Sequence, residues 1–214
     1  MDPLQLIERV ASKIAPGRSP SFTMANVVRA LAMIDRREIG RITLSKELGL
    51  GEGVTRTLLK HLRREGVVRV SRRGIALSDF GKEIACHLRS KISVGIEVQS
   101  SPVTVAGHNI AVRVTGVTHL IDKGIEQRDS AIKAGALGAT TFVFSNNRLV
   151  MPTSKEDVFK DVPLVHEALL SNLNLREDDV VIIGSGETKM SAEIGAIAAA
   201  LDLLKSVLED KSAS

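Results

Sequence analysis

The sequence predicts an α+β protein in which a mostly helical, basic N-terminal domain (residues 1–92) precedes an acidic domain built on a mixed α/β sheet (residues 93–214). The first observation is charge: residues 1–92 hold 18 Lys+Arg and 9 Asp+Glu, residues 93–214 hold 11 and 16, and together they give the formal net charge of +4. The second is periodicity, because helical spacing dominates the first half, whereas β-rich runs alternate with helices in the second. We therefore expect only the first half to meet an anionic partner such as nucleic acid.

Most of the N-terminal domain is predicted to be helical. Apolar residues at helical spacing indicate helices over residues 1–15 and 23–35, and the Pro- and Gly-rich run at 16–21 separates them. Ser78 is a residue type that caps helix starts, and it precedes a predicted helix that runs to about Lys91.

Two helices joined by a glycine-rich turn form the most informative part of the chain. Thr43 or Ser45 can cap a helix over 44–48, and Gly49 can end it in a left-handed conformation. A second helix is predicted from Val54. At 100° per residue, one side of this helix is apolar. The opposite side carries four cations: Arg56, Lys60, Arg63 and Arg64.

A hairpin follows this basic helix. Residues 67–71 and 75–77 read as two short strands, and Ile42 is expected to be a small strand that pairs with them. Arg72 and Arg73 stand side by side at the tip of the hairpin. Their mutual repulsion is costly, and a phosphate backbone or a DNA minor groove would relieve it.

The order of elements over residues 43–77 resembles the winged helix-turn-helix of bacterial and archaeal transcription regulators. The whole chain also looks like uncharacterised archaeal winged-helix proteins that carry a β/α companion domain. The resemblance implies that the basic helix enters the major groove of double-stranded DNA. The side chains then expected at base edges or nearby phosphates are Arg56, Thr57 and Lys60, and those expected at phosphates are Arg63, Arg64, Arg72 and Arg73.

The second half alternates strands and helices, and we expect one mixed sheet with helices packed on it. The predicted strands cover 92–99, 109–115, 140–144, 149–151 and 180–183, with a hairpin turn at Asn146-Asn147. The predicted helices cover 125–136, 163–173 and 189–208. Small residues surround the last helix between 194 and 201, so it is expected to be buried either under the sheet or against a second subunit.

An anion site is suggested where the strand at 180–183 gives way to the last helix. A small-residue loop before a helix start exposes backbone N–H groups, which suit an anion. The residues assigned to this site are Gly184, Ser185, Gly186, Thr188 and Lys189. The alternative is a tight strand-to-helix connection with no ligand, since neither a Walker sequence nor GxGxxG is present.

A second cluster, around the helix at 125–136, adds candidates for the same small anionic metabolite. Arg128 and Lys133 can neutralise a carboxylate or phosphate, and Thr140 and Thr141 can donate hydrogen bonds. The alternative is that Arg128 belongs to an ordinary solvated helix face.

Several functional classes find no support. No catalytic motif is present, so the chain is not expected to be an enzyme, and no cofactor is implied. Histidines at metal-ligand spacing are absent and Cys86 is alone, so neither a metal site nor an intrachain disulfide is expected, and a reducing cytoplasm fits. No signal peptide is visible and no apolar run reaches transmembrane length, so no membrane partner is expected.

These observations favour a DNA-binding transcription regulator whose C-terminal domain senses a small anionic metabolite, dimerises, or does both. A homodimer is expected because two-fold operators require two readers. One alternative is an enzyme acting on a phosphorylated or nucleotide substrate with an appended winged domain, an arrangement known in archaeal riboflavin kinases, whose phosphate-site pattern is absent here. Another is a module whose second half only dimerises.

Overall fold

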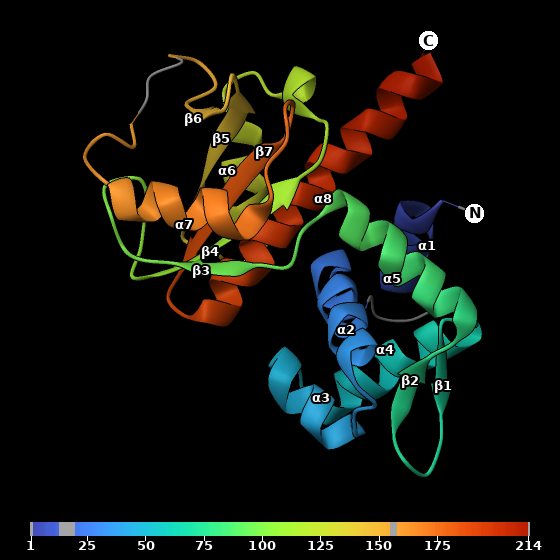
Figure 1. Ribbon diagram of the computed structural model, residues 1–214. Helices are drawn as coiled ribbons and strands as arrows, with labels where there is room; N and C mark the ends of the chain where they lie inside the picture. Colours follow the sequence, from blue (N-terminus) through green and yellow to red (C-terminus); the bar gives the residue numbers. More distant parts are fainter. Residues whose placement is uncertain (1, 13–19, 155–157, 214) are drawn as a thin grey trace. The chain divides into compact units, whose positions relative to one another are not determined.

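The computed structural model describes residues 2–12, 20–154 and 158–213 of the chain (Figure 1). It divides into two compact units, residues 1–89 and residues 90–214. The predicted break at 16–21 lies mostly outside the described residues. The helix predicted over 1–15 ends earlier than expected, at Ala11, and Ser12 is already extended.

The N-terminal unit consists of helices and one hairpin. Its elements are α1 (Pro3–Ala11), α2 (Met24–Arg36), α3 (Arg41–Leu48), α4 (Glu52–Arg64), β1 (Val68–Val70), β2 (Ile75–Leu77) and α5 (Asp79–Lys91). β1 and β2 form a two-stranded antiparallel sheet.

Local sequence signals set the ends of these helices. The side chains of Thr23 and Asn26 form a capping box at the start of α2. Gly49 ends α3 at φ 65°, in the left-handed region, as predicted. The Ser78 hydroxyl accepts a 2.9 Å hydrogen bond from the backbone N–H of Gly81, which confirms the predicted cap of α5.

Two predictions around α3 were wrong. The helix begins at Arg41, with Gly40 as its N-cap, three residues before the predicted start. Ile42 therefore lies in the first turn of α3, where it is 54% exposed, and is not a strand. The residue that pairs with the hairpin is Ile39, which forms an antiparallel bridge with Ile75.

Tertiary contacts hold the helices of this unit together. The buried Arg29 guanidinium on α2 donates to the carbonyls of Glu47 and Leu48, at 3.3 and 3.4 Å, and so satisfies the C-terminal end of α3. The buried His61 ring on α4 lies 2.7 Å from the Val10 carbonyl of α1. Leu58 and Leu62 are fully buried on the inner side of α4, which leaves its cationic side in solvent.

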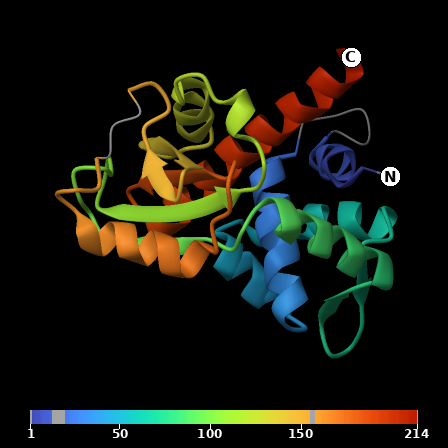
Figure 2. The same ribbon diagram turned by 45° about the horizontal axis from the view of Figure 1, so that its top comes forward.

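The C-terminal unit is a five-stranded sheet with helices on both faces (Figure 2). Its strands are β3 (Ile96–Val98), β4 (His108–Val114), β5 (Gly138–Ser145), β6 (Arg148–Val150) and β7 (Val180–Gly186). Its helices are the 3-10 helix η1 (Thr118–Leu120), α6 (Ile125–Lys133), α7 (Pro163–Leu173) and α8 (Lys189–Ala213). The strand order is β3-β4-β7-β5-β6, and each pairing is antiparallel, so the expectation of a mixed sheet was wrong.

The two faces of the sheet are covered differently. α7 packs on one face over an apolar cluster that includes Phe142, Phe144 and Leu169. The other face meets α8, whose Ala192 and Ala196 are fully buried. The small-residue run of α8 is thus accounted for by burial under the sheet. The turn between β5 and β6 is formed by Asn146 and Asn147, both at positive φ, as predicted.

Two first-turn glycines of the N-terminal unit offer a matched test of helix packing. A Cβ at Gly81 of α5 would overlap the carbonyl oxygen of Val67, whereas a Cβ at Gly53 of α4 would meet nothing within 4 Å. We expect Gly81→Ala to lower the free energy of unfolding by about 2 kcal/mol. Gly53→Ala is expected to raise it by up to about 1 kcal/mol, because alanine is the better helix former. Chemical denaturation of both variants measures the difference, and equal effects would contradict the close approach of α5 to the Val67 carbonyl.

Candidate nucleic-acid interface

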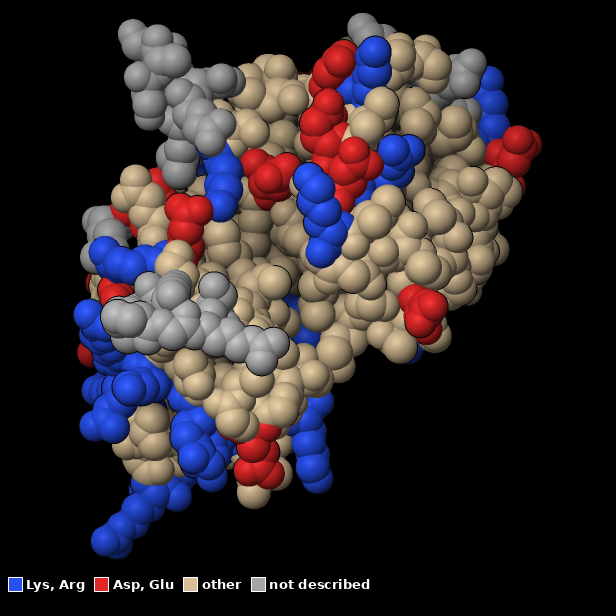
Figure 3. Space-filling model, turned by 180° about the vertical axis from the view of Figure 1, so that it is seen from behind, with Lys and Arg blue, Asp and Glu red and all other residues tan. Residues whose placement is uncertain are grey.

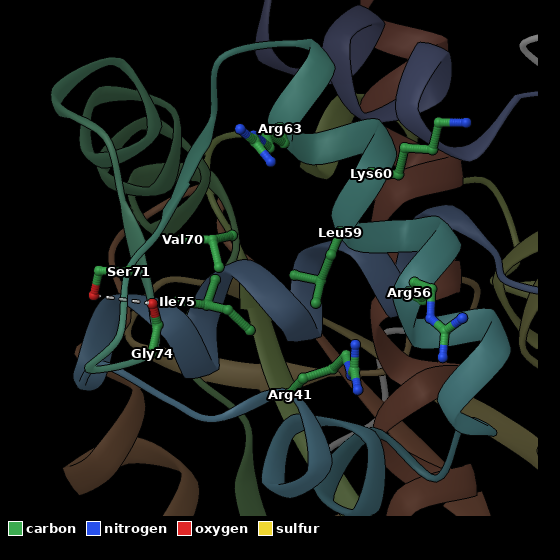
Figure 4. A pocket seen from close by; sticks show the side chains of 9 residues that line it. All are labelled: Arg41, Arg56, Leu59, Lys60, Arg63, Val70, Ser71, Gly74 and Ile75. Atoms are coloured by element: carbon green, nitrogen blue, oxygen red, sulfur yellow. Dashed lines mark hydrogen bonds between the residues drawn. The ribbon is translucent and has the colours of Figure 1, made fainter.

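A pocket of about 440 Å³ opens between α3, α4 and the β1–β2 hairpin (Figure 4). Its lining combines cations with apolar side chains. The lining residues are Arg41, Arg56, Leu59, Lys60, Arg63, Val70, Ser71, Gly74 and Ile75. We call this hollow the α4–hairpin pocket.

Helical spacing positions the cations of α4. Arg56, Lys60 and Arg63 follow one another at i, i+4 and i+7, which places them on one side of the helix. All three are exposed because the leucines on the other side are buried in the unit. In Figure 4, Arg63 and Arg41 lie at opposite ends of the gap between α4 and the hairpin, with Leu59, Val70 and Ile75 between them.

None of the four pocket cations takes part in an ion pair with another described residue of the chain. Other cations of the unit are paired: Arg37 lies 2.7 Å from Glu47, and Arg9 lies 2.6 Å from Glu65. Within the described part of the unit, no carboxylate therefore lies at ion-pair distance from the cations around the pocket. Figure 3 shows Lys and Arg side chains crowded on the surface of the N-terminal unit.

The hairpin is held in place by its attachment to the start of α3. Ile39 and Ile75 exchange two backbone hydrogen bonds, of 3.1 and 2.9 Å. Gly74 next to them has φ +145°, and a Cβ there would lie 3.0 Å from the Ile39 carbonyl oxygen. Glycine is required at this point by both conformation and space. The attachment brings Arg41 and the hairpin to the same pocket.

Asp79 neutralises a cation on the hairpin away from the pocket. Its carboxylate accepts a 3.1 Å hydrogen bond from Lys82 and lies 3.6 Å from the Arg69 guanidinium. The hydrogen bond from Lys82, and then the charges of Lys82 and Arg69, hold the pKa of Asp79 below its ordinary value. The folded state thus favours the charged form, and this contribution to stability is lost only when the pH falls through the lowered pKa.

The structure brings together some of the residues predicted to contact DNA. Arg56, Lys60 and Arg63 line the α4–hairpin pocket. Thr57 and Arg64 are exposed on α4 but do not line it, and the Thr57 hydroxyl donates to the Gly53 carbonyl at 3.1 Å. The remaining predicted residues, Arg72 and Arg73, are exposed at the hairpin tip.

The sequence prediction missed Arg41 and Val70. Arg41 was overlooked because α3 was expected to begin only at residue 44, which left Arg41 outside the helix pair. Its signal was the glycine at position 40, a residue type tolerated at the N-cap. Val70 carried no signal, since a valine in a short strand is expected whether or not it faces a pocket.

Most of the segment predicted as an anion-binding loop belongs to a strand, and only residues 187 and 188 connect it to α8. β7 continues through Gly186, and Gly184, Ser185 and Gly186 pair with neighbouring strands. A Cβ at Gly184 would overlap the Ala192 carbonyl and lie 2.6 Å from the Ala196 nitrogen, so the glycine is needed for α8 to approach the strand. The Ser185 hydroxyl is buried and donates to Asn109 at 2.6 Å.

The other residues of that predicted site also have partners. Thr188 exchanges hydrogen bonds with Ser191 at the start of α8, and the Lys189 ammonium lies 2.8 Å from the Glu97 carboxylate. These contacts explain the presence of Thr188 and Lys189 without a ligand.

The second predicted cluster is spread over two elements. Arg128 lies on the exposed side of α6 and pairs with Asp129 at 3.1 Å, while Thr140 and Thr141 lie in β5. The Thr141 hydroxyl is buried and has no hydrogen-bond partner among the described residues. A separate cavity of about 620 Å³ lies beside η1 and the β5–β6 hairpin, and none of the residues predicted to bind a ligand lines it.

Comparison with known proteins also divides the chain into an N-terminal and a C-terminal part. A family model described as "PH0730-like, N-terminal domain" matches residues 23–83, and one described as "Domain of unknown function (DUF4443)" matches residues 105–203. A solved structure, the hypothetical protein PH0730 from Pyrococcus horikoshii OT3, is 32% identical to the chain. The match covers 87% of this chain and 95% of that protein, with a TM-score of 0.73.

The chain belongs to the PH0730-like family. The match to the family's N-terminal domain spans α2 through the first part of α5, and so contains the whole α4–hairpin pocket. α1 lies outside that match. Among curated proteins, none matches the chain.

The described residues hold neither a cluster of metal ligands nor a helix suited to a membrane. In this part of the chain, no three His, Cys, Asp or Glu side chains gather closely enough to hold a metal ion. Within the same residues, no helix has both the length and the apolar character needed to cross a bilayer.

The conformation of Gly74 predicts a specific weakness of the pocket. We expect Gly74→Ala to destabilise the N-terminal unit by about 1–3 kcal/mol, because the side chain would strain the backbone and press on Ile39. Gly66→Ala is the matched control: Gly66 also has positive φ, but a Cβ there meets nothing within 4 Å. Gly66→Ala should lower the free energy of unfolding by only about 1 kcal/mol, because alanine is strained in the left-handed conformation. Urea unfolding compares the two, and a larger effect at Gly66 would contradict the proposed attachment.

Proposed function

We propose that the protein is a cytoplasmic transcription regulator that binds double-stranded DNA through a winged helix-turn-helix formed by α2 to α5. The observation that carries the proposal is the group of uncompensated cations around the α4–hairpin pocket. Positive charge that the unit itself does not neutralise favours a polyanionic partner, since binding releases the condensed counterions of the nucleic acid.

The arrangement of the elements supports duplex DNA in particular. α3 and α4 are joined by a tight turn at Gly49, and α4 presents its cations along one exposed face. A helix of this kind fits the major groove, while the preceding helix crosses the backbone. On this docking, Arg56 and Lys60 face the groove, and Arg72 and Arg73 reach the backbone or the minor groove from the hairpin tip.

The role of the C-terminal unit is proposed to be dimerisation. The outer side of α6 exposes Ile125 and Ile132, which are seven residues apart and 44% and 47% exposed, and Leu137 just beyond the helix is 51% exposed. Apolar side chains gathered on one helix face favour a partner surface, and a second copy would supply the two-fold symmetry of a DNA operator. The residues assigned to a metabolite site are paired or lie on separate elements, which favours dimerisation over metabolite sensing.

The first test of the proposal is the salt dependence of DNA binding. The logarithm of the affinity for a DNA duplex should fall linearly with the logarithm of salt concentration. Replacing Arg56, Lys60 or Arg63 singly with Ala should weaken binding and reduce the steepness of this fall by about one unit for each phosphate that the variant no longer neutralises. Fluorescence anisotropy of a labelled duplex measures both quantities.

The matched control for these variants is Arg176→Ala. It removes the same charge from an exposed position between α7 and β7, in the other unit and outside the α6 face. If it reduced the salt dependence as much as the α4 variants do, binding would follow net charge alone and the proposed interface would be wrong.

The second test concerns the oligomeric state. We expect the protein to be a dimer in analytical ultracentrifugation, and Ile132→Glu to shift it towards monomer because a charge would be buried at the interface. Leu164→Glu is the control, since Leu164 is a 72% exposed apolar residue on α7, on the opposite face of the sheet. A wild-type monomer, or equal effects of the two variants, would rule out the α6 face as the dimer contact.

A further inference from the structure

Val70 is an exposed apolar side chain in the middle of a cationic surface. In β1, Val68 is buried and Val70, two residues later on the same side of the strand, is 56% exposed. Figure 4 shows its side chain directed into the α4–hairpin pocket, close to Ile75 of the paired strand. A valine at such a position stabilises little within the unit, because more than half of it stays in solvent.

The pocket thus has an apolar middle and cationic ends. Leu59, Val70 and Ile75 contribute only carbon atoms, and Arg41 and Arg63 stand at opposite ends. The Ser71 hydroxyl accepts a 3.0 Å hydrogen bond from the Arg73 backbone N–H and faces the Gly74 carbonyl at 3.4 Å. The Ser71 hydroxyl is thus engaged within the hairpin turn, and the neighbouring Val70 side chain has no atom that could accept a hydrogen bond from a hydroxyl group.

This pattern matches one unit of a nucleic-acid strand. A strand alternates charged phosphates with sugars whose faces are largely carbon and hydrogen. A pocket of about 440 Å³ is large enough for one sugar and its phosphates. Cations at both ends with an apolar surface between them suit a phosphate–sugar–phosphate segment better than a base, whose edge would need hydrogen-bond partners.

We propose that the α4–hairpin pocket holds one sugar of the bound DNA strand, with its two phosphates on Arg41 and Arg63, and that Val70 selects deoxyribose over ribose. The inference rests on the proposed function and specifies its substrate. A ribose in this position would bring its 2′-hydroxyl against the Val70 methyl groups. Where it meets those methyl groups, that hydroxyl would lose water without gaining a hydrogen bond from Val70, which is unfavourable.

The occupant of the pocket can be observed directly. In the complex with a short DNA duplex, selectively labelled Val70 methyl groups should show nuclear Overhauser contacts to deoxyribose protons. Contacts to base protons only, or none while the α4 amide resonances shift on binding, would overturn the proposal and leave DNA binding intact. A protein that binds no duplex at all would overturn both.

The selectivity is tested by a cycle of two proteins and two duplexes. Wild-type protein should bind the DNA duplex more tightly than the RNA duplex of the same sequence. Val70→Thr keeps the shape of the side chain and supplies a hydroxyl partner for the 2′-hydroxyl. The ratio of DNA affinity to RNA affinity should therefore be roughly tenfold smaller in this variant than in the wild type. Groove shape also distinguishes the two duplexes, but it acts equally on both proteins and cancels in the comparison.

Val70→Ile is the control for this cycle, because it remains apolar and β-branched and should leave the preference unchanged. An unchanged preference in Val70→Thr, or an equal change in Val70→Ile, would overturn the role of Val70 in selectivity. Equal binding of DNA and RNA by the wild-type protein would do the same. Thermal unfolding of both variants verifies that the exposed substitutions leave the unit folded.

Discussion

Two backbone hydrogen bonds between Ile39 and Ile75 hold the hairpin of the N-terminal unit to the start of α3. A hairpin of two three-residue strands is too short to be stable alone, so its position depends on this attachment and on the burial of Val68, Ile75 and Leu77. The same bridge lies two residues before Arg41. One short contact therefore sets both walls of the α4–hairpin pocket, and Gly74 is the residue that lets the two segments approach.

The parts of the fold that could be predicted from the sequence are those with local causes. The two faces of α4, the Ser78 cap and the Asn146-Asn147 turn have causes that act within a few residues, and all three were predicted correctly. The bridge to the hairpin was assigned to Ile42 instead of Ile39 because the start of α3 was set too late. An error of three residues in the predicted start of α3 therefore misplaced the residue that pairs with the hairpin and left Arg41 outside the predicted helix pair.

The wrong prediction of an anion-binding loop at residues 184–186 has a different cause. Small residues before a helix are ambiguous in sequence, since they suit both a phosphate loop and a strand pressed closely by a helix. The distinction depends on Ala192 and Ala196, whose backbone lies where a Cβ of Gly184 would be, and this contact is known only once α8 is folded onto β7. The directions of the strands could not be predicted from the sequence either, because pairing between distant segments produces no local pattern of residues.

Among the described residues, the ion pairs of the N-terminal unit lie outside the cationic pocket, although carboxylates are available near it. Acidic residues are present nearby: Glu65 directly follows α4, and Glu47 is in α3. Each is paired with an arginine outside the pocket, Arg9 and Arg37 respectively. The pocket cations are thus left to repel one another although carboxylates lie close in sequence. Such repulsion lowers stability unless an external anion offsets it, and this supports the proposed polyanionic partner over a merely solvated helix face.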